Sequence, residues 1–128
     1  MAELTLRAAG RARADLVWSR YTTYREWPRW SPQIVRVEAP GERVAAGARG
    51  TVRSLPGIAV AFRVESVDEE RRRWVWRVRL GPVRLRLTHE VRALGDGAET
   101  SLRIEGPALA VAAYAPLARL ALHRLLRP

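Results

Sequence analysis

The chain of 128 residues is 48% hydrophobic and 28% charged, which is the size and composition of one ordinary domain with a sizeable core. It contains no cysteine, so disulfides, thiolate catalysis and cysteine-ligated metal centres are excluded. All 23 basic residues are arginine, and against 13 acidic residues they leave a net charge of +10. This excess is spread through the chain and forms no basic tail, which weakens the simplest nucleic-acid-binding interpretation. We expect one domain over residues 1–128.

Several other functional classes find no support in the sequence. The longest charge-free run, residues 106–118, is shorter than a bilayer span and contains two prolines, so no membrane span is predicted. The first residues lack the continuous apolar stretch of a signal peptide, and we expect a cytoplasmic protein. Two histidines, His89 and His123, are too few for a histidine-rich metal site, and no phosphate-binding or metal-binding motif occurs. We therefore expect no metal and no cofactor.

The first third of the chain predicts one strand and two short helices. Residues 2–9 alternate between apolar and polar side chains, as a half-buried strand does. Residues 16–21 suit a short amphipathic helix, with Asp15 in its first turn. Residues 24–30 suit a second short helical piece, which the Ser-Pro dipeptide at 31–32 ends.

The rest of the chain predicts a meander of strands and a final helix. The strand candidates are residues 34–38, 48–55, 59–68, 73–80, 83–93 and 99–105. Short turn signals between the last five favour antiparallel hairpins over βαβ crossovers. Residues 108–126 have helical composition, and Pro116 predicts a kink or a short break within them. The pattern predicts an α+β fold in which a curved antiparallel sheet of about seven strands wraps around a long C-terminal helix.

The alternation also assigns side chains to the two faces of the sheet. The inner face is aliphatic and aromatic, with Ser66, His89 and Thr100 as its polar members. His89 is the only ionisable residue that the alternation places there. It is either a hydrogen-bonded core histidine or a polar group in a cavity wall, able to orient a ligand or transfer a proton. No inward carboxylate accompanies it, so triad and paired-carboxylate catalysis lack support.

The outer face collects most of the charge. Its arginines are Arg53, Arg63, Arg77, Arg79, Arg84, Arg86, Arg92 and Arg103, interleaved with glutamates. We interpret it as a solvated surface with cross-strand Arg–Glu pairs. A polyanion-binding surface is the alternative, but it lacks exposed aromatic residues for base stacking. We do not expect nucleic acid to be a partner.

Four segments occur in a characteristic order along the chain. They are RADLVW (13–18), YREWPRWSPQIVRVE (24–38), the Gly-led strand at 50 and RLTHEVRALGDGAETSLRIEG (86–106), followed by the long helix. In this order the chain resembles the SRPBCC superfamily, also called START-like or helix-grip proteins, and within it the polyketide cyclase/dehydrase and lipid-transport type. The resemblance implies a deep hydrophobic cavity between sheet and C-terminal helix, which relatives use for lipids, polyketides and hormones.

Three hypotheses about function follow. The first is a binding or carrier protein for a hydrophobic small molecule, lipid-like or polyketide-like. Its expected apolar walls are Trp18, Trp27, Trp30, Phe62, Trp74, Trp76, Leu87 and Leu117, with His89 and Tyr114 as polar anchors. The second is a polyketide cyclase, aromatase or dehydratase with His89 as acid or base. The third is a polyanion- or protein-binding module that uses the arginine face. The shortage of charge in the expected cavity favours the first over the second, because a cyclase positions its chain with polar and basic groups.

The effect of added salt on binding distinguishes the first hypothesis from the third. Quenching of tryptophan fluorescence by an apolar ligand will survive added salt, because apolar burial drives it. Any association with RNA or DNA will be weak and lost on adding salt, because phosphate binding releases counterions. Tight, sequence-selective RNA binding at physiological ionic strength would contradict this ranking. Charge reversal at Arg77, Arg79, Arg84 and Arg86 should then abolish that binding without affecting the cavity.

Overall fold

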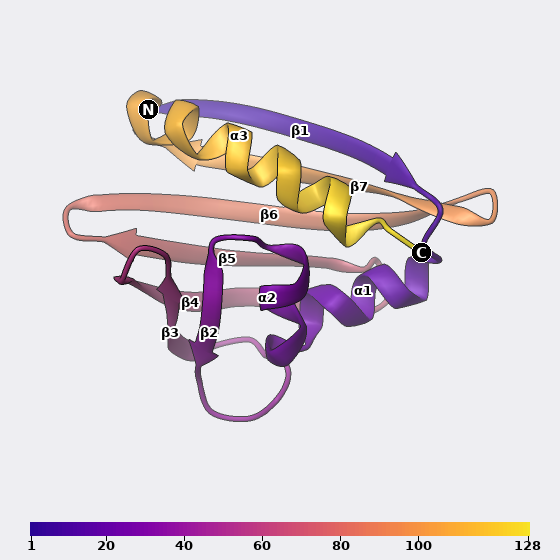
Figure 1. Ribbon diagram of the computed structural model, residues 1–128, viewed down its shortest axis with the longest axis horizontal. Coiled ribbons are helices and arrows are strands. Elements are labelled where there is room, and N and C mark those ends of the chain that lie inside the picture. Colours follow the sequence, from indigo (N-terminus) through magenta and orange to yellow (C-terminus); the bar gives the residue numbers. More distant parts are fainter.

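The computed structural model describes residues 1–128. The elements are β1 (Ala2–Gly10), α1 (Ala14–Thr22), the 3₁₀ turn η1 (Tyr24–Glu26), α2 (Trp27–Trp30), β2 (Ile34–Glu38), β3 (Arg49–Ser54), β4 (Ile58–Asp68), β5 (Arg73–Leu80), β6 (Val83–Leu94), β7 (Gly97–Gly106) and α3 (Ala108–Leu125). Figure 1 shows them in place. The predicted α+β helix-grip fold is confirmed.

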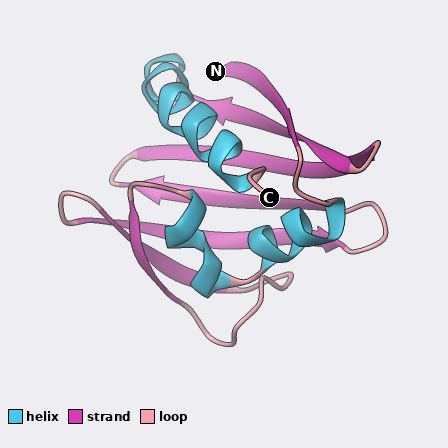
Figure 2. Ribbon diagram, turned by 45° about the vertical axis from the view of Figure 1, so that its right-hand side comes forward, coloured by secondary structure: helices cyan, strands magenta, loops and turns pink.

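One antiparallel sheet carries the fold, with strand order β1-β7-β6-β5-β4-β3-β2. Strands β2 to β7 form the predicted meander, and β1 completes the sheet beside β7. The sheet is strongly twisted, and α3 crosses the same face that α1 and α2 cover (Figures 1 and 2). No helix is long and apolar enough to cross a membrane.

One local prediction is wrong and a second is narrowed, each for an identifiable reason. Ser66, predicted to point inward, is exposed because β4 contains a bulge between Val64 and Ser66. The extra residue moves Val67 opposite Trp74 and reverses the alternation beyond that point. Of the kink or short break predicted at Pro116, the structure excludes the break, since α3 is continuous. Pro116 is exposed, so the helix carbonyl that loses its usual donor has access to water.

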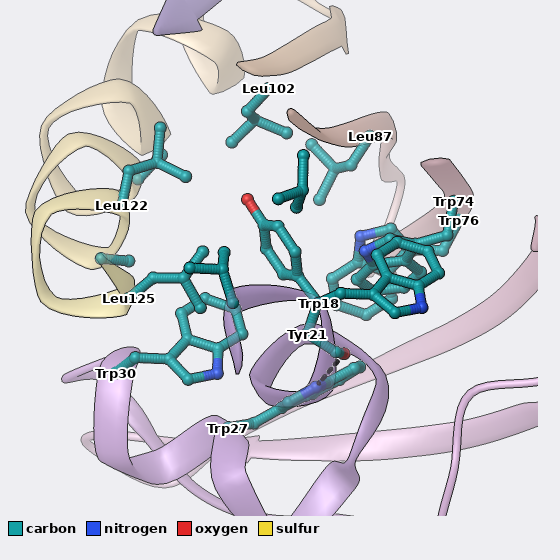
Figure 3. Packing of buried hydrophobic residues seen from close by; sticks show 14 of the residues in the cluster. Trp18, Tyr21, Trp27, Trp30, Trp74, Trp76, Leu87, Leu102, Leu122 and Leu125 are labelled. Atoms are coloured by element: carbon teal, nitrogen blue, oxygen red, sulfur yellow. Dashed lines mark hydrogen bonds between the residues drawn. The ribbon is translucent and has the colours of Figure 1, made fainter. Parts of the chain in front are cut away.

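The first helices are tied together by indole hydrogen bonds. The last carbonyls of an α-helix have no partner within the helix. At the end of α1, Trp27 Nε1 donates to the carbonyl of Tyr21 at 2.8 Å, and Trp30 Nε1 donates to that of Arg20 at 3.0 Å. The tryptophans of α2 therefore complete the hydrogen bonding of α1 while burying their rings under the sheet. Figure 3 shows Tyr21 among the tryptophans, with Leu122 and Leu125 of α3 nearby.

Glycine permits a close junction at the far end of α3. There Gly10, at the end of β1, lies against Leu126, which follows α3. A Cβ on Gly10 would lie 2.6 Å from Leu126 Cβ and 2.8 Å from its carbonyl oxygen. The backbone amide of Ala12 donates to the same carbonyl at 3.1 Å. The end of α3 is held against the sheet at this point, and any side chain would push the two apart.

We predict that Gly10→Ala lowers the free energy of unfolding by about 1–3 kcal/mol, because the added methyl overlaps Leu126. Urea denaturation measures the change. The control is Ala9→Val, which adds more atoms at the neighbouring exposed position of the same strand and should be close to neutral. Equal stability of Gly10→Ala and the parent chain would contradict the close approach.

Candidate functional site

A cavity of about 560 Å³ lies between the concave face of the sheet and α3. Of its 25 lining residues 21 are hydrophobic, and none is Asp, Glu, Lys or Arg. Its size lies in the range of about 300–1,000 Å³ usual for small-molecule sites. No group of three or more His, Asp or Glu side chains is placed to hold a metal ion.

The space exists because the two sides of the cavity have different side chains. Strands β5 and β6 contribute large alternate residues, among them Trp76, Val78 and Leu87. Helix α3 contributes four alanines to the lining: Ala110, Ala113, Ala118 and Ala121. Protein interiors are normally close-packed, and larger residues on α3 would fill the gap. The alanines keep the helix at its distance from the sheet without occupying the space between.

The cavity has a buried end and an open end. Trp27, His89 and Leu122 line the buried end and have almost no exposed surface. Five large apolar lining residues are instead exposed to solvent: Leu55, Ile58, Leu80, Val83 and Leu117. The cavity therefore opens to solvent where the β3–β4 and β5–β6 turns approach α3. We call these five the mouth residues.

Sequence reasoning named ten ligand-binding residues, and the structure separates them into two groups. Seven line the cavity: Trp27, Trp30, Trp76, Leu87, His89, Tyr114 and Leu117. Three do not: Trp18, Phe62 and Trp74. Trp18 Nε1 donates to Glu69 Oε2 at 2.5 Å, and Phe62 packs edge-on behind Trp76 with ring centroids 5.4 Å apart. Phe62 and Trp74 pack against the lining residue Trp76.

Two sets of lining residues are absent from the ten predicted from the sequence. The first is the lining alanines of α3, for which the high alanine content of the helix, seven of its 18 residues, was an available signal. The second is a polar group, Ser31, Gln33 and Ser54. Ser54 Oγ donates to the backbone carbonyl of Gln33 at 3.1 Å, and Gln33 Oε1 is buried without a partner. These residues stand in loops and at strand ends, where alternation predicts no face.

His89 is held in one state by its neighbours. Trp76 Nε1 donates to His89 Nε2 at 2.9 Å, and the imidazole stacks on Trp74 with centroids 4.6 Å apart and planes 12° apart. Burial lowers the pKa of His89 to about 3, because desolvation penalises the charged ring. The ring is neutral near pH 7, and since Nε2 accepts a bond, its proton resides on Nδ1, which has no partner.

Two tyrosines, the buried Tyr21 and the partly buried Tyr114, have neutral hydroxyls. Tyr21 Oη lies 2.6 Å from Thr100 Oγ1, which itself donates to the carbonyl of Glu90 at 3.1 Å. The single threonine proton is thereby used, so Tyr21 is the donor to Thr100. Burial raises the pKa of Tyr21 and raises that of Tyr114, a cavity-lining residue, to about 12. Neither hydroxyl ionises near neutral pH, so the cavity offers hydrogen bonds but no charge.

A model of the family described as polyketide cyclase / dehydrase and lipid transport matches residues 1–127. No curated protein matches the chain in sequence.

Solved structures of similar shape include proteins of several kinds. The di-domain ARO/CYC BexL from the BE-7585A biosynthetic pathway is 20% identical, with a TM-score of 0.83 over 98% of this chain and 45% of BexL. Major latex-like protein 151 from Panax ginseng is 14% identical, with a TM-score of 0.79 over 97% of this chain and 94% of its own. Norcoclaurine synthase from Thalictrum flavum, in complex with dopamine and hydroxybenzaldehyde, is 18% identical, with a TM-score of 0.67 over 97% of this chain and 83% of its own. At such identities the likeness is one of fold.

The buried imidazole makes stability depend on pH. Its pKa in the folded chain, about 3, lies below the unfolded value near 6.5, so the unfolded chain binds the proton first as pH falls. We predict that between pH 7 and pH 5 the free energy of unfolding drops by about 2 kcal/mol on this account.

The variant His89→Gln tests this prediction, since its amide oxygen can still accept from Trp76 Nε1 but cannot titrate. Urea denaturation across pH 5–7 (a window above the carboxyl pKa values) should show a flatter profile for the variant. Parallel profiles for the variant and the parent chain would contradict the buried neutral state.

Proposed function

Because the chain belongs to the polyketide cyclase/dehydrase and lipid-transport family, we propose that it binds and carries a hydrophobic small molecule in the cavity under α3. This family is part of the SRPBCC superfamily that the sequence resembles. The proposed ligand is lipid-like or polyketide-like. The observation that carries the proposal is the cavity lining, 21 hydrophobic residues of 25 with no formal charge.

The lining also restricts the ligand. Burying about 300 Å² of apolar ligand surface contributes roughly 7 kcal/mol before the costs of association. An ionised carboxylate or amine inside the cavity would lose its hydration and meet no opposite charge. We therefore propose a neutral ligand whose few polar atoms meet Tyr114 or the group of Ser31, Gln33 and Ser54. Trp27, Trp30, Trp76, Leu87 and Leu117 are its proposed apolar contacts.

Carrying is a better match to the site than catalysis. A cyclase needs a group that gives or takes a proton near neutral pH. His89 has its Nε2 lone pair engaged by Trp76 and a pKa of about 3, and burial moves the Tyr21 and Tyr114 pKa values away from neutrality. His89 is better explained as a positioning residue for Trp76. A cytoplasmic location and a single domain over residues 1–128 remain parts of the proposal.

The relatives support a small ligand of this kind. Norcoclaurine synthase was solved with dopamine and hydroxybenzaldehyde, so the fold holds small aromatic molecules in that protein. Here the tryptophans at the buried end, Trp27, Trp30 and Trp76, offer flat faces for a ring. An aromatic or polycyclic ligand is therefore the form of apolar molecule that we propose first.

Filling the cavity tests the proposal. We predict that Val78→Trp weakens binding of the neutral fluorophore N-phenylnaphthylamine at least about tenfold, because the indole occupies the space that the probe needs. A fluorescence titration measures the affinity.

The matched control is Arg79→Trp, which places the same side chain one residue further on, on the opposite and exposed face of β5. It should bind the probe as the parent chain does. Equal probe affinity in Val78→Trp and the parent chain, with both folded by circular dichroism, would overturn the cavity as the binding site.

A further inference from the structure

The mouth of the cavity is unusually apolar for an exposed surface. Leu55 is 60% exposed and Leu80 46% exposed, and Ile58, Val83 and Leu117 are also exposed. Leu109, which does not line the cavity, is 87% exposed in the first turn of α3. Single exposed apolar residues need no explanation, but a group of them around one opening marks an interaction site.

The pairing of the strands brings these residues to one end of the molecule. Leu55 lies in the turn between β3 and β4, next to the paired residues Ser54 and Ile58. Leu80 pairs with Val83 beside the turn between β5 and β6. Antiparallel pairing of β4 with β5 puts both turns at the same end. The first turn of α3 arrives there too, because β7 ends beside the start of β6. Figure 1 shows these turns and the start of α3 together at its left side.

The opposite end of the sheet has a different surface. The turn between β4 and β5 carries Asp68, Glu69, Glu70, Arg71 and Arg72. Leu94, 52% exposed, is the one large apolar side chain exposed at the other turn of that end, between β6 and β7. The concentration of exposed apolar side chains is therefore specific to the end where the cavity opens.

The charged side chains in the two turns at the mouth are all positive. Arg79 on β5 pairs directly with Arg84 on β6. This pair is next to the pair Leu80 and Val83, which adjoins the β5–β6 turn. Both arginines are exposed, and neither belongs to any of the ion pairs of the chain. Like charges directly opposite each other destabilise a sheet. The turn segments 54–59 and 79–84 contain no acidic residue.

We propose that the mouth docks on a lipid bilayer that contains anionic lipids. The mouth residues and Leu109 insert among the headgroups, while Arg79 and Arg84 bind lipid phosphates. This inference rests on the proposed function, because it gives the apolar ligand a path between bilayer and cavity that avoids water. Interfacial binding of this kind scales with buried apolar area and with attraction of basic residues to anionic lipid.

The observations favour a bilayer over a second copy of the chain. Two copies meeting at their mouths would bring Arg79 and Arg84 against the same unpaired arginines, which repel. An anionic bilayer neutralises them. The exposed apolar residues are also divided between two turns and a helix around an opening, and a fluid interface can contact all three together.

Co-sedimentation with vesicles tests the proposal. The parent chain should bind vesicles of phosphatidylcholine with about 30% phosphatidylserine, and bind pure phosphatidylcholine much more weakly. Arg79→Glu/Arg84→Glu should weaken binding to the mixed vesicles at least about tenfold. Leu80→Ser/Val83→Ser should weaken it comparably, by removing the inserted side chains.

Matched variants at the other end of the molecule distinguish docking through the mouth from nonspecific binding to vesicles. Arg11→Glu/Arg127→Glu makes the same charge change at exposed positions beside the junction of Ala12 and Leu126. Leu16→Ser/Leu94→Ser removes two leucines of similar exposure. Both controls should retain most of the vesicle binding. If they lose as much as the mouth variants, net charge or hydrophobicity explains the binding and the proposal is overturned.

Two further outcomes would also overturn it. The first is failure of the parent chain to bind mixed vesicles. The second is light scattering that shows a dimer which Leu80→Ser/Val83→Ser dissociates, since the mouth would then be an interface between copies. Binding of N-phenylnaphthylamine without vesicles is measured alongside. Probe binding without vesicle binding removes only the docking, whereas vesicle binding without probe binding supports the docking and removes the cavity as a carrier site.

Discussion

The site depends on which groups donate hydrogen bonds to the backbone carbonyls at the C-terminal end of α1. Two carbonyls at its last turn accept hydrogen bonds from the indoles of Trp27 and Trp30, and those indoles can reach them only with α2 folded back beneath the sheet. The same two rings then line the buried end of the cavity. A polar requirement of a short helix thus decides where the largest apolar side chains lie. Losing either bond would leave a buried carbonyl unpaired and loosen the cavity wall.

The cavity requires α3 to pack on the sheet at one end and to leave space beneath it at the other. Helix α3 must bury an apolar face to stay on the sheet, which it does with Leu122 and Leu125. Nearer its start, alanines face the sheet and leave space. Filling that space would stabilise the chain by added contacts, so the void costs stability. Glycine at position 10 compensates in part, because it lets the far end of α3 approach the sheet closely while the mouth end stays open.

Charge is sorted between the two faces of the sheet with few exceptions. Outward arginines share glutamates, as Arg77 and Arg86 do with Glu65, while the inward face has only the neutral imidazole of His89. Arg79 and Arg84, which form no ion pair, lie where the sheet ends at the cavity mouth. A cavity lining without charge, and mouth turns whose only charged side chains are arginines, match the proposed apolar ligand and the proposed anionic bilayer.

The sequence by itself determined the order of elements, the face of most strand residues and the apolar character of the interior, because period-two alternation and turn residues are local signals. Tertiary structure decided the rest. It placed Trp27, Trp30 and Trp76 in the cavity wall and Trp18, Phe62 and Trp74 outside the lining. Alternation states which face a residue takes but not its depth or what packs over it. The bulge at Ser66 and the location of the mouth likewise follow from pairing between distant strands, which no local pattern encodes.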